Sequence, residues 1–145
     1  MKKTTGLVFF LAALSLLSGV LLSKATLIGR VGINLFYQEY KFLKVWWQGA
    51  FVIFTALMLL LLVHLIVQKL LDYKTAKFTY ILALAVALVG MYLTYKDFRE
   101  SLSHRLLGER FHIGAYLFWL GWICINMFFL VLQKQVNNKV TSITE

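Results

Sequence analysis

Proline is absent from this 145-residue chain, whereas average usage would give roughly seven. Proline is the commonest cause of a sharp helix kink, and many transporters build their ion sites from helices that proline or glycine interrupts. No proline is available here to break a helix. We therefore expect straight, uninterrupted helices.

Cysteine is nearly absent as well, because Cys124 is the only one and it lies within an apolar run. One cysteine excludes a disulfide within these residues and the cysteine patterns of zinc sites, so we expect Cys124 to be a small packed residue. His104 and His112 form no metal-spaced cluster with carboxylates. We expect no metal and no cofactor.

Acidic residues are few, with 6 Asp+Glu against 15 Lys+Arg and a formal net charge of +9. None of them lies in the four long apolar runs, which disfavours a small proton-driven transporter that couples through a membrane carboxylate. The basic residues are scattered over all the connections. This distribution predicts contact with anionic lipid headgroups and no nucleic acid partner.

Apolar residues make up 61% of the chain, well above the 45 to 50% or so of soluble domains. A helix that crosses a bilayer needs about 20 of them in sequence, and the chain has four such runs, at 6–22, 49–67, 78–95 and 113–132. We predict one all-α domain over 1–145, a multi-pass integral membrane protein with four transmembrane helices. The polar tail 133–145 should fray.

The start of the first run imitates a signal peptide, because Lys2 and Lys3 precede it and Ser23-Lys24-Ala25 follows it. A signal-peptide core has about 7 to 15 residues, and this run is longer, so we interpret it as an uncleaved span. Basic residues divide almost evenly between the two sides and do not decide the orientation. Lys2 and Lys3 favour cytoplasmic termini, and we expect the plasma membrane.

Aromatic residues mark the ends of the spans. Trp46 and Trp47 precede the second run, and we predict that they anchor it at the membrane interface, as Tyr73 and Tyr80 should anchor the third. In the first connection, 25–45, aromatic and apolar residues recur on one helical stripe. This segment is an interfacial amphipathic helix or an irregular loop, and the pattern favours neither.

Small residues should mark the contacts between helices, because helices in lipid associate by close packing. The candidates lie on helical stripes and are Ala12, Ser15 and Gly19; Gly49 and Ala56; Ala83, Ala87 and Gly90; and Gly114 and Gly121. Their recurrent seven-residue spacing predicts a left-handed antiparallel bundle. The alternative is that one stripe forms a homo-oligomer surface.

His64 is the only titratable side chain well inside a run, and such a residue is a functional candidate by default. The structural alternative is a neutral histidine that bonds a neighbouring helix. Asn126 is expected to join helices, at about 1 kcal/mol, with a substrate ligand as its alternative. His64 and His112 cannot share a haem, because His64 lies about 24 Å along its helix from the level of His112.

A mixed-charge group after the third run, Lys96, Asp97, Arg99 and Glu100, is interpreted as a solvated helix end. The chain has no nucleophile elbow, zinc-protease motif, P-loop or paired carboxylates. We therefore expect no enzyme activity and no catalytic residue.

The order of features from Trp47 onwards resembles the superfamily of peripheral myelin protein, epithelial membrane proteins and claudins. Trp47-Gln48-Gly49-Ala50 is similar to the start of that family's second helix, and Tyr95-Lys96-Asp97-Phe98 to the end of its third. The segment from Phe111 to Trp122 resembles the F-x-x-G-A-x-L-x-x-x-G/A-W opening of its fourth. The first loop departs from the pattern, because it is short and has no cysteine.

The resemblance implies a left-handed four-helix bundle that acts by lateral association. Our first hypothesis is a non-enzymatic accessory or scaffolding subunit, with membrane lipids and other integral membrane proteins, or further copies of itself, as partners. The alternative is a small transporter or lipid-handling protein that uses His64 and Asn126, which would require a polar cavity.

Overall fold

The computed structural model describes residues 2–24, 45–100 and 109–144, with side chains from residue 4 up to residue 134. The described residues contain four helices and no strand: α1 (Lys2–Ser23), α3 (Trp46–Leu70), α4 (Tyr73–Glu100) and α6 (Glu109–Thr144). All four are long and apolar enough to cross a membrane. The prediction of an all-helical chain with four such helices is confirmed for the described residues.

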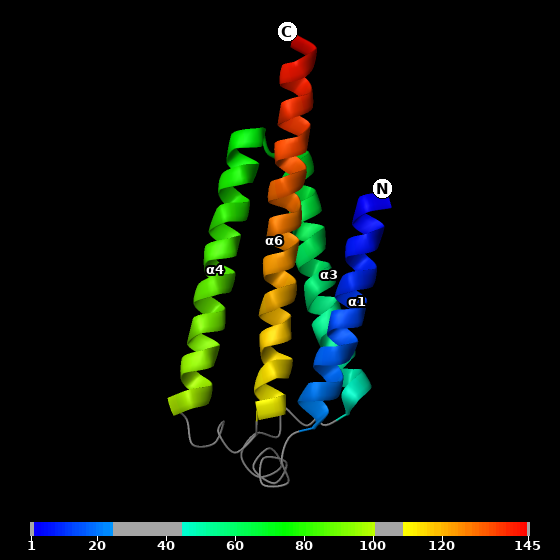
Figure 1. Ribbon diagram of the computed structural model, residues 1–145, viewed down its shortest axis with the longest axis vertical. Coiled ribbons are helices and arrows are strands. Elements are labelled where there is room, and N and C mark those ends of the chain that lie inside the picture. The colour runs from blue at the N-terminus through cyan, green and yellow to red at the C-terminus, as the bar shows by residue number, and fades with distance from the viewer. Residues whose placement is uncertain (1, 25–44, 101–108, 145) are drawn as a thin grey trace.

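Successive described helices alternate in direction (Figure 1). The start of α1, the turn between α3 and α4, and the second half of α6 lie at the same end of the molecule. Residue contacts agree, because Gly19 near the end of α1 lies against Trp46 at the start of α3, and Gly114 near the start of α6 lies against Leu22.

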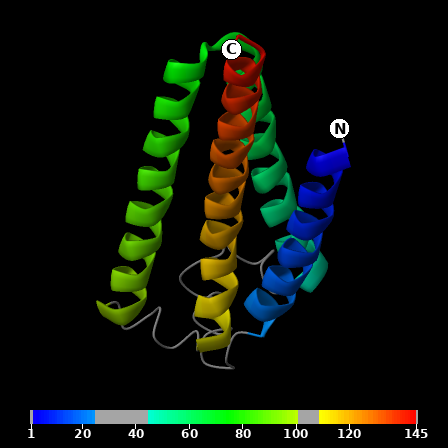
Figure 2. The same ribbon diagram turned by 45° about the horizontal axis from the view of Figure 1, so that its top comes forward.

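Helix α6 holds the bundle together, because it packs on each of the other three described helices. Helices α1 and α3 also pack closely on each other, whereas α4 rests mainly on α6 and only slightly on α3 (Figure 2). The fully buried apolar side chains include Leu11 of α1, Leu57 of α3 and Ile125 and Phe129 of α6. The core therefore lies where α1, α3 and α6 meet.

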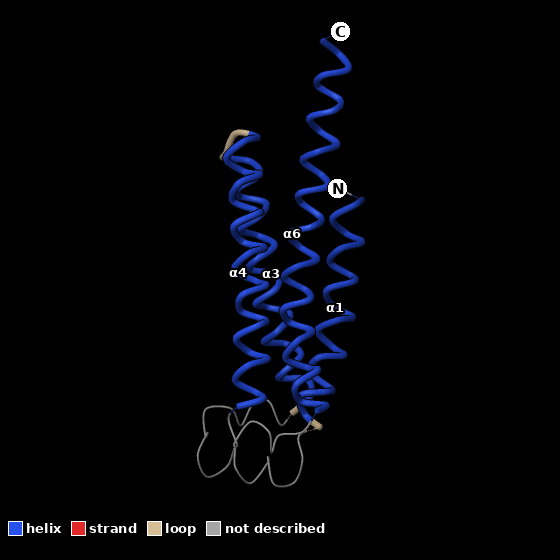
Figure 3. Tube along the Cα trace, turned by 60° about the vertical axis from the view of Figure 1, so that its left-hand side comes forward, coloured by secondary structure: helices blue, strands red, loops and turns tan. Residues whose placement is uncertain are grey.

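The helices are longer than the apolar runs. Helix α4 starts at Tyr73 and ends at Glu100, so the mixed-charge group forms its last turns, with an exposed contact of 4.0 Å between Lys96 and Glu100. Helix α6 continues to Thr144 (Figure 3), through the tail that we expected to fray. Extending a formed helix costs far less than starting one, which explains why the polar tail stays helical. The first connection, 25–44, lies outside the described residues.

Asp72 starts α4. Its carboxylate accepts hydrogen bonds from the Thr75 hydroxyl at 2.7 Å and from the backbone N–H groups of Lys74 and Thr75 at 3.1 and 3.2 Å. This is an N-cap, which supplies partners to the otherwise unpaired N–H groups of a first turn. The Thr75 hydroxyl, followed by the backbone N–H groups, lowers the pKa of Asp72 from its ordinary value of 3.8.

Replacing Asp72 by alanine should therefore lower the thermal midpoint in a pH-dependent way. The folded state prefers the carboxylate, so its contribution is present above the ordinary pKa and is lost as the pH falls through the lowered pKa. Thermal unfolding in detergent should show a gap between the thermal midpoints of wild type and Asp72→Ala at neutral pH that narrows as the pH falls below the ordinary pKa of 3.8. A gap that stays constant with pH would contradict the cap.

Glycines permit the closest helix contacts. A Cβ built on Gly19 would lie 2.5 Å from the backbone nitrogen of Ala50, and one built on Gly114 would lie 3.1 Å from the carbonyl oxygen of Ser18. A Cβ on Gly90 would overlap the Trp119 ring, and one on Gly121 would lie 2.8 Å from a Leu57 methyl. The structure thus brings these four predicted small residues into interhelical contacts.

Gly19→Ala should destabilise the bundle by about 1 to 3 kcal/mol, because the contact at that Cβ is backbone and overpacking forces the helices apart. Gly6→Ala is the matched control in the same helix, since nothing lies within 4 Å of its added Cβ and alanine favours a helix by about 1 kcal/mol. Unfolding in a mixed detergent titration measures both. Equal stabilities of the two variants would refute the close contact.

Candidate functional site

Two polar side chains of the candidate set are buried on facing helices, His64 of α3 and Asn126 of α6, at 4% and 0% exposure. They lie 62 residues apart in sequence, and His64 Nε2 is 2.9 Å from Asn126 Oδ1. The two residues predicted separately as a functional candidate and as a helix-joining residue are therefore direct partners.

Each of the two side chains has a second partner on its own helix. His64 Nδ1 lies 2.7 Å from the carbonyl oxygen of Leu60. The Asn126 amide nitrogen donates to the carbonyl oxygen of Trp122 at 3.0 Å. Each side chain thus contacts the other one and a backbone carbonyl one turn earlier on its own helix. These two contacts restrict its rotamer from both sides.

Tyr80 of α4 completes what we call the polar cluster, defined as His64, Tyr80 and Asn126. We predicted Tyr80 at the membrane interface, and this prediction is wrong, because Tyr80 is fully buried. Its hydroxyl donates to the carbonyl oxygen of His64 at 3.1 Å, and its ring stacks on the imidazole with centroids 5.3 Å apart. A buried tyrosine keeps its hydroxyl bonded, and this one does so across to α3.

The physical reason for the wrong prediction is the rotation of α4. Tyr80 lies seven residues before Ala87 and four after Ala76, and these are the three buried residues of that helix. It therefore belongs to the same stripe as the small residues, with Ala83 half-buried between them. The i, i+4, i+7 spacing was the sequence signal that could have placed Tyr80 in the core.

The polar cluster also has an apolar wall and a polar neighbour. Phe129 is fully buried, with its ring centroid 5.4 Å from that of His64 and 5.5 Å from that of Tyr80. Gln133, one turn further along α6, is also buried. The cluster is thus a packed junction of three helices.

A second polar contact joins α4 to α6 nearer the other end. The Trp119 indole donates to the Thr94 hydroxyl at 3.0 Å, and that hydroxyl donates to the carbonyl oxygen of Gly90 at 2.8 Å. Trp119 stacks on Trp122, with centroids 5.5 Å apart. The Trp122 indole N–H is the one buried side-chain nitrogen or oxygen without a hydrogen-bond partner among the described residues.

The remaining candidates are not part of the cluster. Trp46 and Trp47 are 51% and 55% exposed at the start of α3, where interface anchors would lie. Ser15 is buried and donates to Leu11 of its own helix at 2.7 Å. His112 stacks on Phe98 at 4.3 Å, about 21 Å along α6 from the level of Asn126, so it lies far from His64. His104 is outside the described residues.

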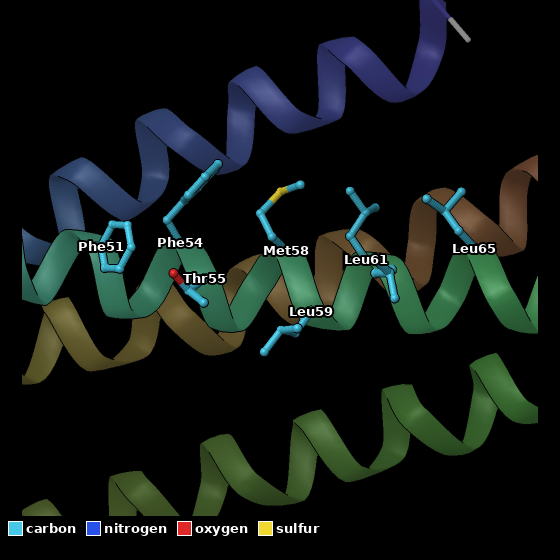
Figure 4. Close-up of a pocket in the computed structure, with 8 residues that line it drawn as sticks. Phe51, Phe54, Thr55, Met58, Leu59, Leu61 and Leu65 are labelled. Atoms are coloured by element: carbon cyan, nitrogen blue, oxygen red, sulfur yellow. The ribbon is translucent and has the colours of Figure 1, made fainter.

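The polar cluster does not line the pocket on α3. That pocket has a volume of about 330 Å³, and its eight lining residues, from Phe51 to Leu65, all belong to α3 and are apolar except Thr55 (Figure 4). Figure 4 shows Phe54 and Met58 pointing towards α1. The pocket is an apolar groove along one helix, and its lining side chains offer no polar group beyond the Thr55 hydroxyl.

No three His, Cys, Asp or Glu side chains lie close enough to hold a metal ion in the part of the chain that the structure describes. No known protein family, curated protein or solved structure matches the chain. Its function has to be argued from its own residues.

The hydrogen bond between His64 and Asn126 should stabilise the bundle. In a double-mutant cycle with His64→Leu and Asn126→Leu, we expect a coupling energy between about 0.6 and about 1.7 kcal/mol, the average and the maximum for interhelical hydrogen bonds in membranes. Each single variant should lose more free energy of unfolding than this coupling energy, because it leaves a buried polar group unpaired. Unfolding of the four proteins in detergent provides the measurement, and a coupling of zero would show that the pair contributes nothing.

Proposed function

We propose that the chain is a non-enzymatic, multi-pass membrane protein that acts as an accessory or scaffolding subunit by lateral association with other membrane proteins. The proposed architecture is a left-handed antiparallel bundle of four transmembrane helices in the plasma membrane, with cytoplasmic termini. The resemblance of Trp47–Ala50, Tyr95–Phe98 and Phe111–Trp122 to the claudin and peripheral myelin protein superfamily supports the same type of function.

The observation that carries the proposal is the outer face of α4. Of its 28 residues only Ala76, Tyr80 and Ala87 are buried, and one stripe to the side of them is apolar and about half exposed. This outer stripe consists of Leu82, Val86, Val89 and Leu93. A peripheral helix with so little contact inside its own chain leaves a long apolar surface for lipid or for another membrane helix.

The distribution of polar groups supports association more than transport. A transporter that used His64 and Asn126 would have to expose both to a water-filled path. Both are instead buried and hydrogen-bonded to each other and to backbone carbonyls, and the pocket on α3 contains neither. The geometry therefore favours packing as their role.

Site-specific photocrosslinking in native membranes tests the proposal. A benzophenone amino acid at Val86, in the outer stripe, should crosslink to a discrete protein band. Val131 on α6 is the matched control, because it is similarly exposed, at 53% against 50%, on a different helix. We expect the protein crosslink at Val86 and lipid products alone at Val131.

Mild-detergent purification should give the same answer independently, as a complex of defined stoichiometry with another membrane protein or with further copies of the chain. A lone monomer, together with crosslinks only to lipid at Val86, would contradict lateral association. Uptake of a solute into liposomes that is lost in His64→Ala would favour transport instead.

A further inference from the structure

The apolar groove on α3 leads along the helix to a lysine. Thr55 and Leu62 line the groove at an interval of seven residues, and Lys69 follows Leu62 at the same interval in the last turn of α3. Seven residues are almost two turns, so all three lie on one face of the helix. Lys69 is exposed. One face of α3 therefore combines an apolar groove with a positive charge beyond its end.

The groove has the length and the width of a hydrocarbon chain. From Thr55 to Leu65 it runs about 15 Å along the helix, which is the depth of one leaflet in a hydrocarbon core about 30 Å thick. Its volume of about 330 Å³ extends over about 21 Å from Phe51 to Leu65, an average cross-section of about 16 Å². A helix about 10 Å across has a cross-section of about 80 Å². A hydrocarbon chain fits along the groove, whereas a partner helix would insert only side chains.

The groove has α1 on one side and is open to the bilayer on the other. Helices α1 and α3 touch at Gly19 and Ala50 and diverge towards the start of α1 (Figure 1). Phe54 and Met58 point towards α1 (Figure 4), while Leu62 is 53% exposed. A lipid molecule can therefore enter the groove from the membrane without any change in the bundle.

The end of the molecule at which the groove ends is basic. We call it the basic end, and its exposed lysines include Lys69, Lys74, Lys77 and Lys134. Asp72 is the one carboxylate there in the part of the chain that the structure describes, and its oxygens already accept the N-cap hydrogen bonds of α4. Lysines near a membrane surface attract anionic lipids, by a factor of about five in affinity for each lysine. The charge at the basic end therefore complements an anionic headgroup.

We propose that the groove and Lys69 form a binding site for one anionic phospholipid. One acyl chain lies along α3 from Leu65 towards Thr55, and the phosphate group lies beside the Lys69 ammonium, one turn beyond the groove. Such a lipid joins the two chemistries of this face, because it carries a hydrocarbon chain of leaflet depth below a negative headgroup. The site rests on the transmembrane placement that the proposed function includes, but it does not require lateral association.

Native mass spectrometry of the delipidated chain in mild detergent tests the site, with dioleoylphosphatidylglycerol as the anionic lipid and dioleoylphosphatidylcholine as the zwitterionic one. We expect saturable binding of one phospholipid per chain. Phosphatidylglycerol should bind about fivefold more tightly, since one lysine near the headgroup contributes about this factor. Equal affinities for the two lipids, or binding that rises without saturating, would overturn the site.

Matched variants on two helices locate the bound lipid. Lys69→Gln should remove the preference for phosphatidylglycerol, and Leu62→Trp should weaken the binding of both lipids, because the larger side chain fills the groove. On α6, the exposed Lys134 also follows an exposed apolar residue, Met127, by seven residues. Lys134→Gln and Met127→Trp are therefore the controls and should leave both affinities unchanged. Equal effects on α3 and α6 would contradict the site and would show a general attraction of lipid to lysines.

The lipid site and lateral association fail separately, because none of these variants touches the outer stripe of α4. A protein crosslink at Val86 together with no retained phospholipid would refute the lipid site alone. Saturable binding of phosphatidylglycerol together with crosslinks only to lipid at Val86 would support the site and refute lateral association.

Discussion

A bilayer provides no hydrogen-bond partners, so each polar group within a membrane-spanning helix has to find one inside the bundle. The buried polar side chains follow this constraint. Ser18 of α1 donates to the carbonyl oxygen of Gly114 at 2.6 Å, Ser15 to its own helix, and His64 and Asn126 bond each other. Among the described side chains, the Trp122 indole N–H is the one buried nitrogen or oxygen group without a hydrogen-bond partner. The polar residues thus determine which helix faces which.

Close packing and polar pairing act at the same places. Gly114 accepts the Ser18 hydroxyl because the two backbones approach closely there, and Gly90 leaves room for the Trp119 ring, whose indole reaches Thr94. In lipid, where apolar burial between helices brings little, such close contacts and hydrogen bonds are the main source of association. From Ile81 to Leu93, the exposed side chains of α4 are apolar or aromatic. This surface is the basis of the proposed lateral association.

The four helices could be predicted because an apolar run of about 20 residues is a strong signal on its own. The small residues at the contacts were also predictable, since Gly19, Gly90, Gly114 and Gly121 lie on recognisable stripes. The pairing of His64 with Asn126 was not, because nothing local relates residues 62 positions apart. Tyr80 was misplaced for a different reason. An aromatic near a span end favours the interface on average, and here the helical spacing of Tyr80 with Ala76 and Ala87, which places it on the buried stripe of α4, was the better signal.

The most direct test is the separation of His64 Nε2 from the Asn126 side-chain carbonyl carbon, measured by solid-state NMR in lipid bilayers. The hydrogen bond of 2.9 Å, with a carbonyl bond of about 1.23 Å, predicts a separation below about 4.2 Å. That result would show the two polar residues joined inside the membrane, as the account requires. A separation greater than about 6 Å, well beyond hydrogen-bond reach, would contradict it and would leave His64 and Asn126 free to face water or a substrate.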